Sequence, residues 1–182
     1  MQRRQFLGAM GTLSGAGLVS VPLDLLAQRT PDVIFVPTDF QVVIAMLKLA
    51  EVTSKDMVYD LGCGDGRFVV TAARQFGARG VGIDIDPERI KEARELAART
   101  GAGDRVRFIE SDLFEADISE ATVVTLYLLT RLNLKLRPKL LKELKPGTRI
   151  VSHAFDMGDW KPEKSESVGS SSIYLWRVPP RA

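Results

Sequence analysis

A glycine-rich turn between an apolar strand and a helix is the feature that most constrains the fold of this chain. The turn spans residues 62–66, follows the apolar segment Met57-Val58-Tyr59, and leads into helical spacing from Arg67 onward. Glycine lacks a Cβ atom, so such a turn can bend sharply and let a ligand approach the backbone. Asp60 ends the strand and would point its carboxylate into the same crevice. The stretch therefore predicts a strand, turn and helix around a ligand site.

Strand-like and helical segments alternate along the rest of the chain. Further strands are expected over residues 80–84, 105–110, 121–129 and 148–154, and an antiparallel hairpin over residues 163–168 and 173–178. Helices are expected after a capping box of Thr38 and Gln41, after Asp86-Pro87, and within residues 131–144, where Pro138 would mark the start of the regular helix. This order predicts an α/β fold whose open, mostly parallel sheet is covered on both sides.

Three acidic residues stand at the ends of three successive predicted strands. They are Asp60, Asp84 and Asp112. Ligands of open parallel sheets bind at the carboxyl ends of the strands, so the three side chains are expected to share one site. Each also has a structural explanation, because Asp60 could cap the turn, Asp84 could cap the loop, and Asp112 could form an Asx-turn. Their joint placement favours a binding site.

The motifs that bind phosphate-bearing ligands are missing. A dinucleotide-binding turn requires Gly-x-Gly-x-x-Gly, but position 67 is arginine, and the Gly-Lys-Ser/Thr ending of a Walker loop is absent. An acid-rich rim also disfavours phosphate and favours a ligand with hydroxyls and positive charge. S-adenosylmethionine has these groups in its ribose diol, its ammonium group and its sulfonium.

Composition excludes several other classes of site. The 182 residues are 45% apolar and 26% charged, which indicates one globular domain. The formal net charge is +2 with both signs mixed along the chain, so no nucleic-acid partner is indicated. Cys63 and His153 are the single cysteine and the single histidine, which excludes an intramolecular disulfide and a cysteine or multi-histidine metal cluster. No metal site is predicted.

Residues 60–66 resemble the first motif of class I S-adenosylmethionine-dependent methyltransferases. The resemblance implies a Rossmann-like, mostly parallel seven-stranded sheet with a C-terminal antiparallel hairpin, and it covers roughly residues 35–178. It narrows to the small protein-lysine methyltransferases that include the archaeal broad-specificity enzyme and the mitochondrial enzyme acting on an ATP synthase subunit. The stretches that carry this narrower resemblance are Phe35–Thr38, Asp112–Phe114, Ala121–Leu129, Leu144–Arg149 and Val151–His153 with Phe155.

This resemblance implies roles for individual residues toward S-adenosyl-L-methionine. Asp84 would accept two hydrogen bonds from the ribose diol, and Asp60 would lie near the amino group. Asp112 would receive the adenine amino group, with Leu113 as a wall of the ring. The cofactor-binding residues that it implies are Thr38, Asp60, Gly62, Gly64, Gly66, Asp84, Asp112 and Leu113.

The reaction expected is in-line methyl transfer to a nucleophile, with the lysine side chain of a protein substrate as the acceptor. Such a lysine must be neutral, and desolvation lowers its pKa. No catalytic residue is identified; Tyr127 and His153 are weak candidates, and a structural role is favoured for the histidine. The Asn/Asp-Pro-Pro-aromatic motif associated with amide or adenine methylation does not follow the fourth strand. The alternatives are a small-molecule methyltransferase and an exported protein that binds the cofactor without catalysis.

The first 27 residues are typical of an export signal of the twin-arginine type. Arg3-Arg4 precedes a charge-free run over residues 6–23 that is rich in glycine, alanine, leucine and valine. Leu25 is not small, so the cleavage site is poorly defined and an uncleaved membrane anchor is the other option. We expect a periplasmic or membrane-anchored protein, with a cytoplasmic one as the alternative, a linker over residues 28–34 and a methyltransferase domain over residues 35–182.

Overall fold

The structure, a computed structural model, describes residues 35–181. Its strands are β1 (Met57–Leu61), β2 (Arg79–Asp84), β3 (Val106–Glu110), β4 (Val123–Leu126), β5 (Arg149–His153), β6 (Lys164–Val168) and β7 (Ser171–Arg177). Its helices are α1 (Phe40–Leu49), α2 (Arg67–Phe76), α3 (Pro87–Thr100) and α4 (Thr130–Glu143). The export signal and linker expected over residues 1–34 lie outside the described residues.

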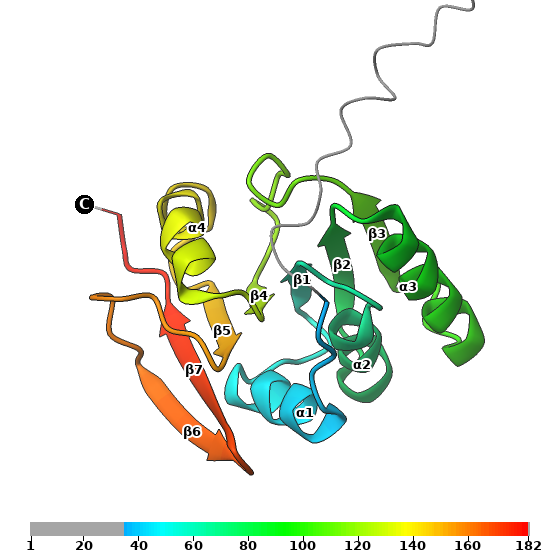
Figure 1. Ribbon diagram of the computed structural model, residues 1–182, viewed down its shortest axis with the longest axis horizontal. Helices are drawn as coiled ribbons and strands as arrows, with labels where there is room; N and C mark the ends of the chain where they lie inside the picture. The colour runs from blue at the N-terminus through cyan, green and yellow to red at the C-terminus, as the bar shows by residue number, and fades with distance from the viewer. Residues whose placement is uncertain (1–34, 182) are drawn as a thin grey trace, which may run out of the picture.

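The seven strands form one sheet in the order β3-β2-β1-β4-β5-β7-β6 (Figure 1). Strands β1 to β5 pair in parallel, whereas β7 runs antiparallel to both β5 and β6. The order reverses between β1 and β4, which places a crevice at the carboxyl ends of these strands. The predicted mostly parallel sheet with an antiparallel hairpin at its end is confirmed.

Two apolar layers cover the two faces of the sheet. Successive strand residues point to opposite faces, so Val58 belongs to the cluster under α1, α2 and α3, and Tyr59 to the cluster under α4. The same alternation separates Val123 from Val124 in β4. Burial on both faces explains why the central strands are apolar throughout. Residues 111–122, between β3 and β4, form turns and no helix, with Ile118 buried against the α4 layer.

The first helix begins one residue later than the predicted capping box. Asp39 is the N-cap, and its carboxylate accepts a hydrogen bond of 2.7 Å from the backbone N–H of Gln41. The predicted cap, Thr38, is buried instead and its hydroxyl lies 3.2 Å from Nδ1 of His153. The capping-box prediction is therefore wrong, because a contact across the fold takes the threonine hydroxyl.

Helix α4 begins at Thr130 and contains Pro138 in its interior. The prediction that Pro138 starts the regular helix is wrong. Leu132, Leu136 and Leu140 are buried along one stripe that extends on both sides of the proline, and packing of this stripe on the sheet holds the helix together. Pro138 itself is exposed, on the side away from the core.

None of the helices within residues 35–181 has the length and apolar character that crossing a membrane requires.

Candidate functional site

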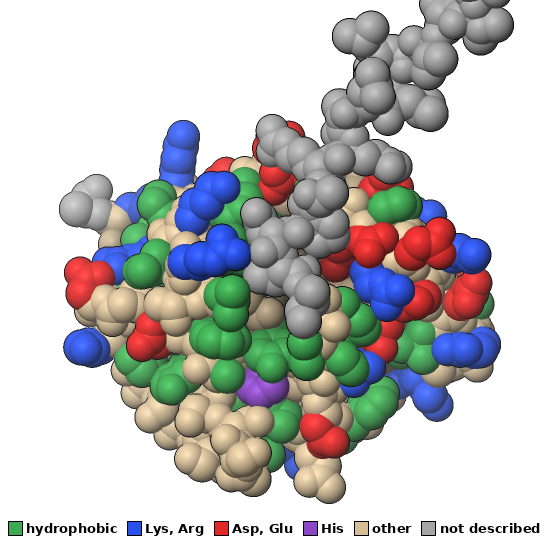
Figure 2. All heavy atoms as spheres, viewed as in Figure 1, with side chains coloured by type: hydrophobic (Ala, Val, Ile, Leu, Met, Phe, Trp, Pro, Cys, Tyr) green, Lys and Arg blue, Asp and Glu red, His purple; other side chains and the backbone are tan. Residues whose placement is uncertain are grey.

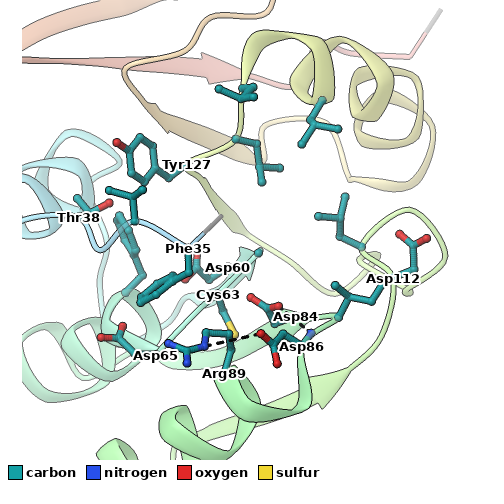
Figure 3. Close-up of a pocket in the computed structure, with 18 of the residues that line it drawn as sticks. Phe35, Thr38, Asp60, Cys63, Asp65, Asp84, Asp86, Arg89, Asp112 and Tyr127 are labelled. Carbon is teal, nitrogen blue, oxygen red and sulfur yellow. Dashed lines mark hydrogen bonds and ion pairs between the residues drawn. The ribbon is translucent and has the colours of Figure 1, made fainter. Parts of the chain in front are cut away.

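A cavity of about 750 Å³ opens at the carboxyl ends of β1, β2 and β4 (Figure 3). This volume lies within the range of pockets that enclose a whole small molecule, roughly 300–1,000 Å³. The cavity brings together most of the site residues expected from the sequence. Those that line it are Thr38, Asp60, Gly62, Asp84, Asp112, Leu113 and Tyr127. Gly64, Gly66 and His153 do not line it.

The glycine turn between β1 and α2 shapes the floor of the cavity. Gly62, Gly64 and Gly66 all have positive φ angles, at 81°, 51° and 78°, which L side chains rarely adopt. A Cβ atom on Gly64 would lie 2.1 Å from the Phe35 ring, and one on Gly66 would lie 2.7 Å from Phe108. Gly62 alone of the three lines the cavity. The structure therefore gives Gly64 and Gly66 packing roles, and their expected contact with a ligand stays a prediction.

Asp60 contributes a buried carboxyl group to the floor. Its side chain is 3% exposed and accepts a hydrogen bond of 2.6 Å from the hydroxyl of Thr125 in β4. The pKa of Asp60 is raised to about 8, mainly by burial and also by the nearby carboxylates of Asp84 and Asp65, while the Thr125 bond and Arg67 oppose the shift. A cation beside Asp60 would favour its charged form. The floor is therefore suited to a positively charged ligand group.

Asp84 ends β2 and is held by two backbone groups. Its Oδ2 accepts from the N–H of Gly64 at 2.8 Å, and its Oδ1 accepts from the N–H of Asp86 at 3.0 Å. The loop-capping role considered for Asp84 is thus present. A carboxylate has about four acceptor sites, so further sites remain for hydroxyl donors in the cavity. The capping bonds fix the carboxylate in place for such a ligand.

Asp112 follows β3 and shapes the segment that closes the far side of the cavity. Its Oδ1 accepts a hydrogen bond of 2.9 Å from the N–H of Phe114, which is the Asx-turn considered from the sequence. The turn places Asp112 and Leu113 in the cavity wall. Polar and apolar groups side by side suit a flat ring with an amino group at its edge.

Aromatic side chains form the mouth of the cavity. Tyr127 lines the mouth and stacks on His153 with ring centroids 4.1 Å apart; the Phe155 ring lies 6.0 Å from the Tyr127 ring. Hydrogen bonds join both ring nitrogens of His153 to hydroxyls, with Thr38 at 3.2 Å and Ser171 at 3.0 Å. Burial lowers the pKa of His153, so the ring is held neutral. His153 therefore supports Tyr127 and Thr38 from behind the cavity wall.

Sequence reasoning missed a set of contacts that holds the segment before α1 over the glycine turn. Arg67 pairs with Asp65 at 2.5 Å, donates to the backbone carbonyl of Thr38, and lies over the Phe40 ring at 5.2 Å. The sequence hints at Arg67 only through its departure from the Gly-x-Gly-x-x-Gly pattern of a dinucleotide-binding turn. Arg67 thus connects the start of α1 to the glycine turn through contacts with Thr38 and Phe40, which are distant from it in sequence.

A second arginine holds Phe35 in a similar way. The guanidinium of Arg89, on α3, lies 5.1 Å from the centre of the Phe35 ring. Both residues line the cavity (Figure 3), and the Phe35 ring lies against Gly64 of the glycine turn. No local pattern connects residues so distant in sequence.

Among the described residues no cluster of histidine, cysteine, aspartate or glutamate could hold a metal ion.

Comparison with known proteins agrees with this geometry. The family model of the ANTKMT methyltransferase domain matches residues 60–164. The chain is 51% identical over 153 residues to a protein-lysine N-methyltransferase of Saccharolobus islandicus (strain REY15A), covering 81% of this chain and 95% of the relative. It is 28% identical over 166 residues to the human (Homo sapiens) lysine N-methyltransferase named for an ATP synthase subunit, covering 91% of this chain and 70% of the relative.

One solved structure is similar in both sequence and fold. It is the crystal structure of a Salinibacter ruber protein described as an RNA methyltransferase, in complex with S-adenosyl-L-homocysteine. The TM-score is 0.80 at 55% identity, and the match covers 81% of this chain and 96% of the other.

Proposed function

The chain belongs to the family of the ANTKMT methyltransferase domain, and from that membership we propose that it is an S-adenosyl-L-methionine-dependent methyltransferase acting on protein lysine side chains. One observation carries the proposal. The carboxylates at the ends of β1, β2 and β3 converge with the glycine turn in a single cavity of about 750 Å³. The names of the two lysine N-methyltransferases support the acceptor, and the S-adenosyl-L-homocysteine bound to the Salinibacter ruber protein supports the cofactor.

The residues of the cavity fit each part of this cofactor. Asp84, held by two backbone N–H groups, would accept the ribose hydroxyls. Asp112 and Leu113 would border the adenine, and buried Asp60 would face the ammonium group. Gly62 would let the methionyl chain pass close to the backbone. When bound, the cofactor supplies a methyl group on a sulfonium, which is already a good leaving group.

The mouth of the cavity would prepare the acceptor. Tyr127, Leu129 and Phe155 line it and offer a site of low polarity. A lysine held there loses water, and desolvation lowers its pKa toward the neutral, nucleophilic form. Tyr127 would align the lysine nitrogen with the methyl group, since alignment contributes much of the rate of such a transfer. His153 acts here as a positioning residue, because both its ring nitrogens are engaged and it does not line the cavity.

A second candidate acceptor is RNA, which the description of the Salinibacter ruber protein favours. The cavity argues against it. Its lining combines five acidic residues, Asp60, Asp65, Asp84, Asp86 and Asp112, with four basic ones, Arg67, Arg89, Arg131 and Lys135, so it offers a phosphate backbone no net positive charge. The net charge of +2 adds little attraction for nucleic acid.

Transfer of a labelled methyl group tests the proposal. The purified protein is incubated with S-adenosyl-L-methionine labelled in the methyl group and a cell lysate, and the label is located after separate protease and ribonuclease digestion. We expect label on lysine side chains. Label confined to RNA or to small metabolites would overturn the lysine assignment and leave the methyltransferase assignment intact. The Asp84→Ala variant, which lacks the carboxylate assigned to the ribose hydroxyls, is the negative control.

We also propose, from the sequence of residues 1–27 alone, that the chain is exported by a twin-arginine route or anchored in a membrane through residues 6–23. Fractionation of a tagged full-length chain tests this. The wild-type chain is expected in the periplasm or the membrane, and an Arg3→Lys/Arg4→Lys variant in the cytoplasm. Equal cytoplasmic distribution of both would contradict the proposal.

A further inference from the structure

The outer face of α4 beside the cavity mouth is basic. Arg131 and Lys135 line the mouth, and Lys142 lies two turns further along the same face. All three are exposed, and basic side chains gather over α4 in the surface view (Figure 2). Among residues 35–181 neither Lys135 nor Lys142 forms an ion pair.

Two other basic residues of α4 differ from these lysines. Lys139 pairs with Glu143 at 2.8 Å, and Arg137 pairs with Asp159. Both lie on the flanks of the helix and are only partly exposed. The two α4 lysines that have no carboxylate partner among the described residues, Lys135 and Lys142, thus share the face of the helix that leads to the cavity.

Apolar side chains interrupt this basic face. Leu134 flanks the basic face one turn after Arg131 and is 43% exposed, and Leu129 at the start of the helix is 38% exposed. The ammonium group of Lys135 lies 3.9 Å from the centre of the Phe114 ring, a cation–π contact that fixes its position at the mouth. We name Arg131, Leu134, Lys135 and Lys142 the α4 ridge.

The acids of the cavity and the α4 ridge have opposite charges. Asp84 and Asp112 line the cavity, whereas Arg131 and Lys135 of the ridge at its rim are basic. An extended peptide that places a lysine in the cavity would therefore find its best match if its neighbouring residues were acidic and apolar. On the basis of the proposed lysine methyltransferase function, we propose that the α4 ridge binds an acidic, partly apolar segment of the protein substrate next to the acceptor lysine.

An RNA backbone would also be attracted to the basic residues of the ridge. Two features favour a protein segment. The exposed leucines beside these residues offer apolar contacts that a phosphate backbone does not use, and the mixed charges of the cavity give an RNA strand no net attraction. RNA binding is therefore an outcome that the test must distinguish.

Methylation of three matched peptides tests the proposal. Each has the same length and one lysine, and the residues beside the lysine are Asp, Glu and Leu in the first, Ser and Gln in the second, and Arg in the third. The wild-type enzyme is expected to have a KM about tenfold lower for the acidic peptide than for the neutral one, with similar kcat, since charges at a rim act mainly on encounter and binding. This advantage should shrink as salt is raised to about 0.5 M.

Reversing the charge of the two ridge lysines provides the second part of the test. The K135E/K142E variant is expected to lose the preference for the acidic peptide and to gain one for the Arg-flanked peptide. K48E/K91E is the matched control, because it changes the net charge equally at exposed lysines of α1 and α3, on the opposite face of the sheet. The control should keep the wild-type preference.

Three results overturn the proposal. The first is that the wild-type enzyme has equal KM values for all three peptides, and the second is that both double variants lose the preference equally. The third is that an RNA oligonucleotide competes with the acidic peptide and that this competition is abolished in K135E/K142E. Failure to methylate any of the three peptides would instead contradict the proposed function itself. Thermal unfolding of each variant confirms that it is folded.

Discussion

At the scale of single residues, the environment of Asp60 determines which ligand group the cavity favours. Burial is the main cause that raises the pKa of this carboxyl to about 8, and neighbouring Asp84 and Asp65 add to it. At about pH 6.5 Asp60 is therefore protonated in the unliganded protein, whereas a bound ammonium group would favour the ionised form. Binding of the cofactor should then expel a proton from the site.

We predict that S-adenosyl-L-methionine releases close to one proton when it binds at about pH 6.5. Binding heats measured in buffers of different ionisation enthalpy give this number directly. The release should decline as pH rises toward about 8, where Asp60 is already ionising. The Asp60→Asn variant should release none. Equal proton release by wild type and variant would disprove the assignment of the ammonium group to Asp60.

Asp84 leads to a separate prediction about affinity. Asp84→Asn keeps an oxygen that accepts from the N–H of Gly64 but loses the charge that would hold the ribose diol. A hydrogen bond to a charged group contributes about 1.5–3 kcal/mol, so the Kd for the cofactor should rise by about 10- to 100-fold. Calorimetry measures the change, with exposed Asp104→Asn as the control. An unchanged Kd would mean that Asp84 only caps the loop.

At the scale of elements, the segment before α1 and the glycine turn fit together through Phe35 and Gly64. An alanine Cβ at position 64 would lie 2.1 Å from the Phe35 ring, and the φ of 51° adds backbone strain. We predict that Gly64→Ala lowers the free energy of unfolding by about 2–4 kcal/mol, from about 1–2 for strain and the rest for the clash.

A double-mutant cycle separates these two causes. Phe35→Ala removes the clash but leaves the strain, so it should restore about half of the stability lost in Gly64→Ala, as measured by urea unfolding. Additive effects of the two substitutions would show that the ring does not rest on the turn.

The elements also differ in how well the sequence predicts them. The starts of α2 and α3 follow from local signals: Gly66 precedes α2, and Asp86 caps α3 by accepting a hydrogen bond of 2.9 Å from the N–H of Glu88. The interior position of Pro138 was mispredicted, because packing of leucines against the sheet outweighs the local preference of proline.

Within the candidate site, too, some features follow from the sequence pattern and others depend on contacts between distant residues. The three strand-end acids were predicted, since the topology of a parallel sheet brings strand ends together. The contacts of Arg67 with Thr38 and of Arg89 with Phe35 were not, because they join residues far apart in the chain and leave no periodic pattern. The packing roles of Gly64 and Gly66 escaped prediction for the same reason.

At the scale of the whole molecule, Asp56 links the ends of the strands opposite the cavity. It accepts hydrogen bonds from Thr122 at 2.7 Å and from the backbone N–H of Thr53 at 2.8 Å, and it pairs with Arg149. Burial would raise the pKa of Asp56, but these bonds and the arginine together hold it below the ordinary 3.8. The interactions therefore stabilise the fold above this pH and are lost as pH falls through the lowered pKa.

We predict that Asp56→Ala lowers the free energy of unfolding by about 3 kcal/mol at about pH 7, because it leaves Arg149 without its buried partner. Glu163→Ala, which breaks an exposed pair with Arg177, should cost less than about 1 kcal/mol. Urea unfolding measures both. Cofactor affinity should be unchanged in Asp56→Ala under conditions where it is folded, and the difference between the two variants should shrink below about pH 4.

The position of β7 has a consequence for biosynthesis. This strand is the last of the seven in sequence order but lies inside the sheet, between β5 and β6, and its Trp176 is fully buried. A nascent chain that stops short of residue 171 keeps β5 as an open edge with unpaired backbone groups, which is a template for aggregation. The sheet can close only once β7 has left the ribosome, so a chain that terminates before residue 171 is an aggregation-prone product and not a shortened enzyme.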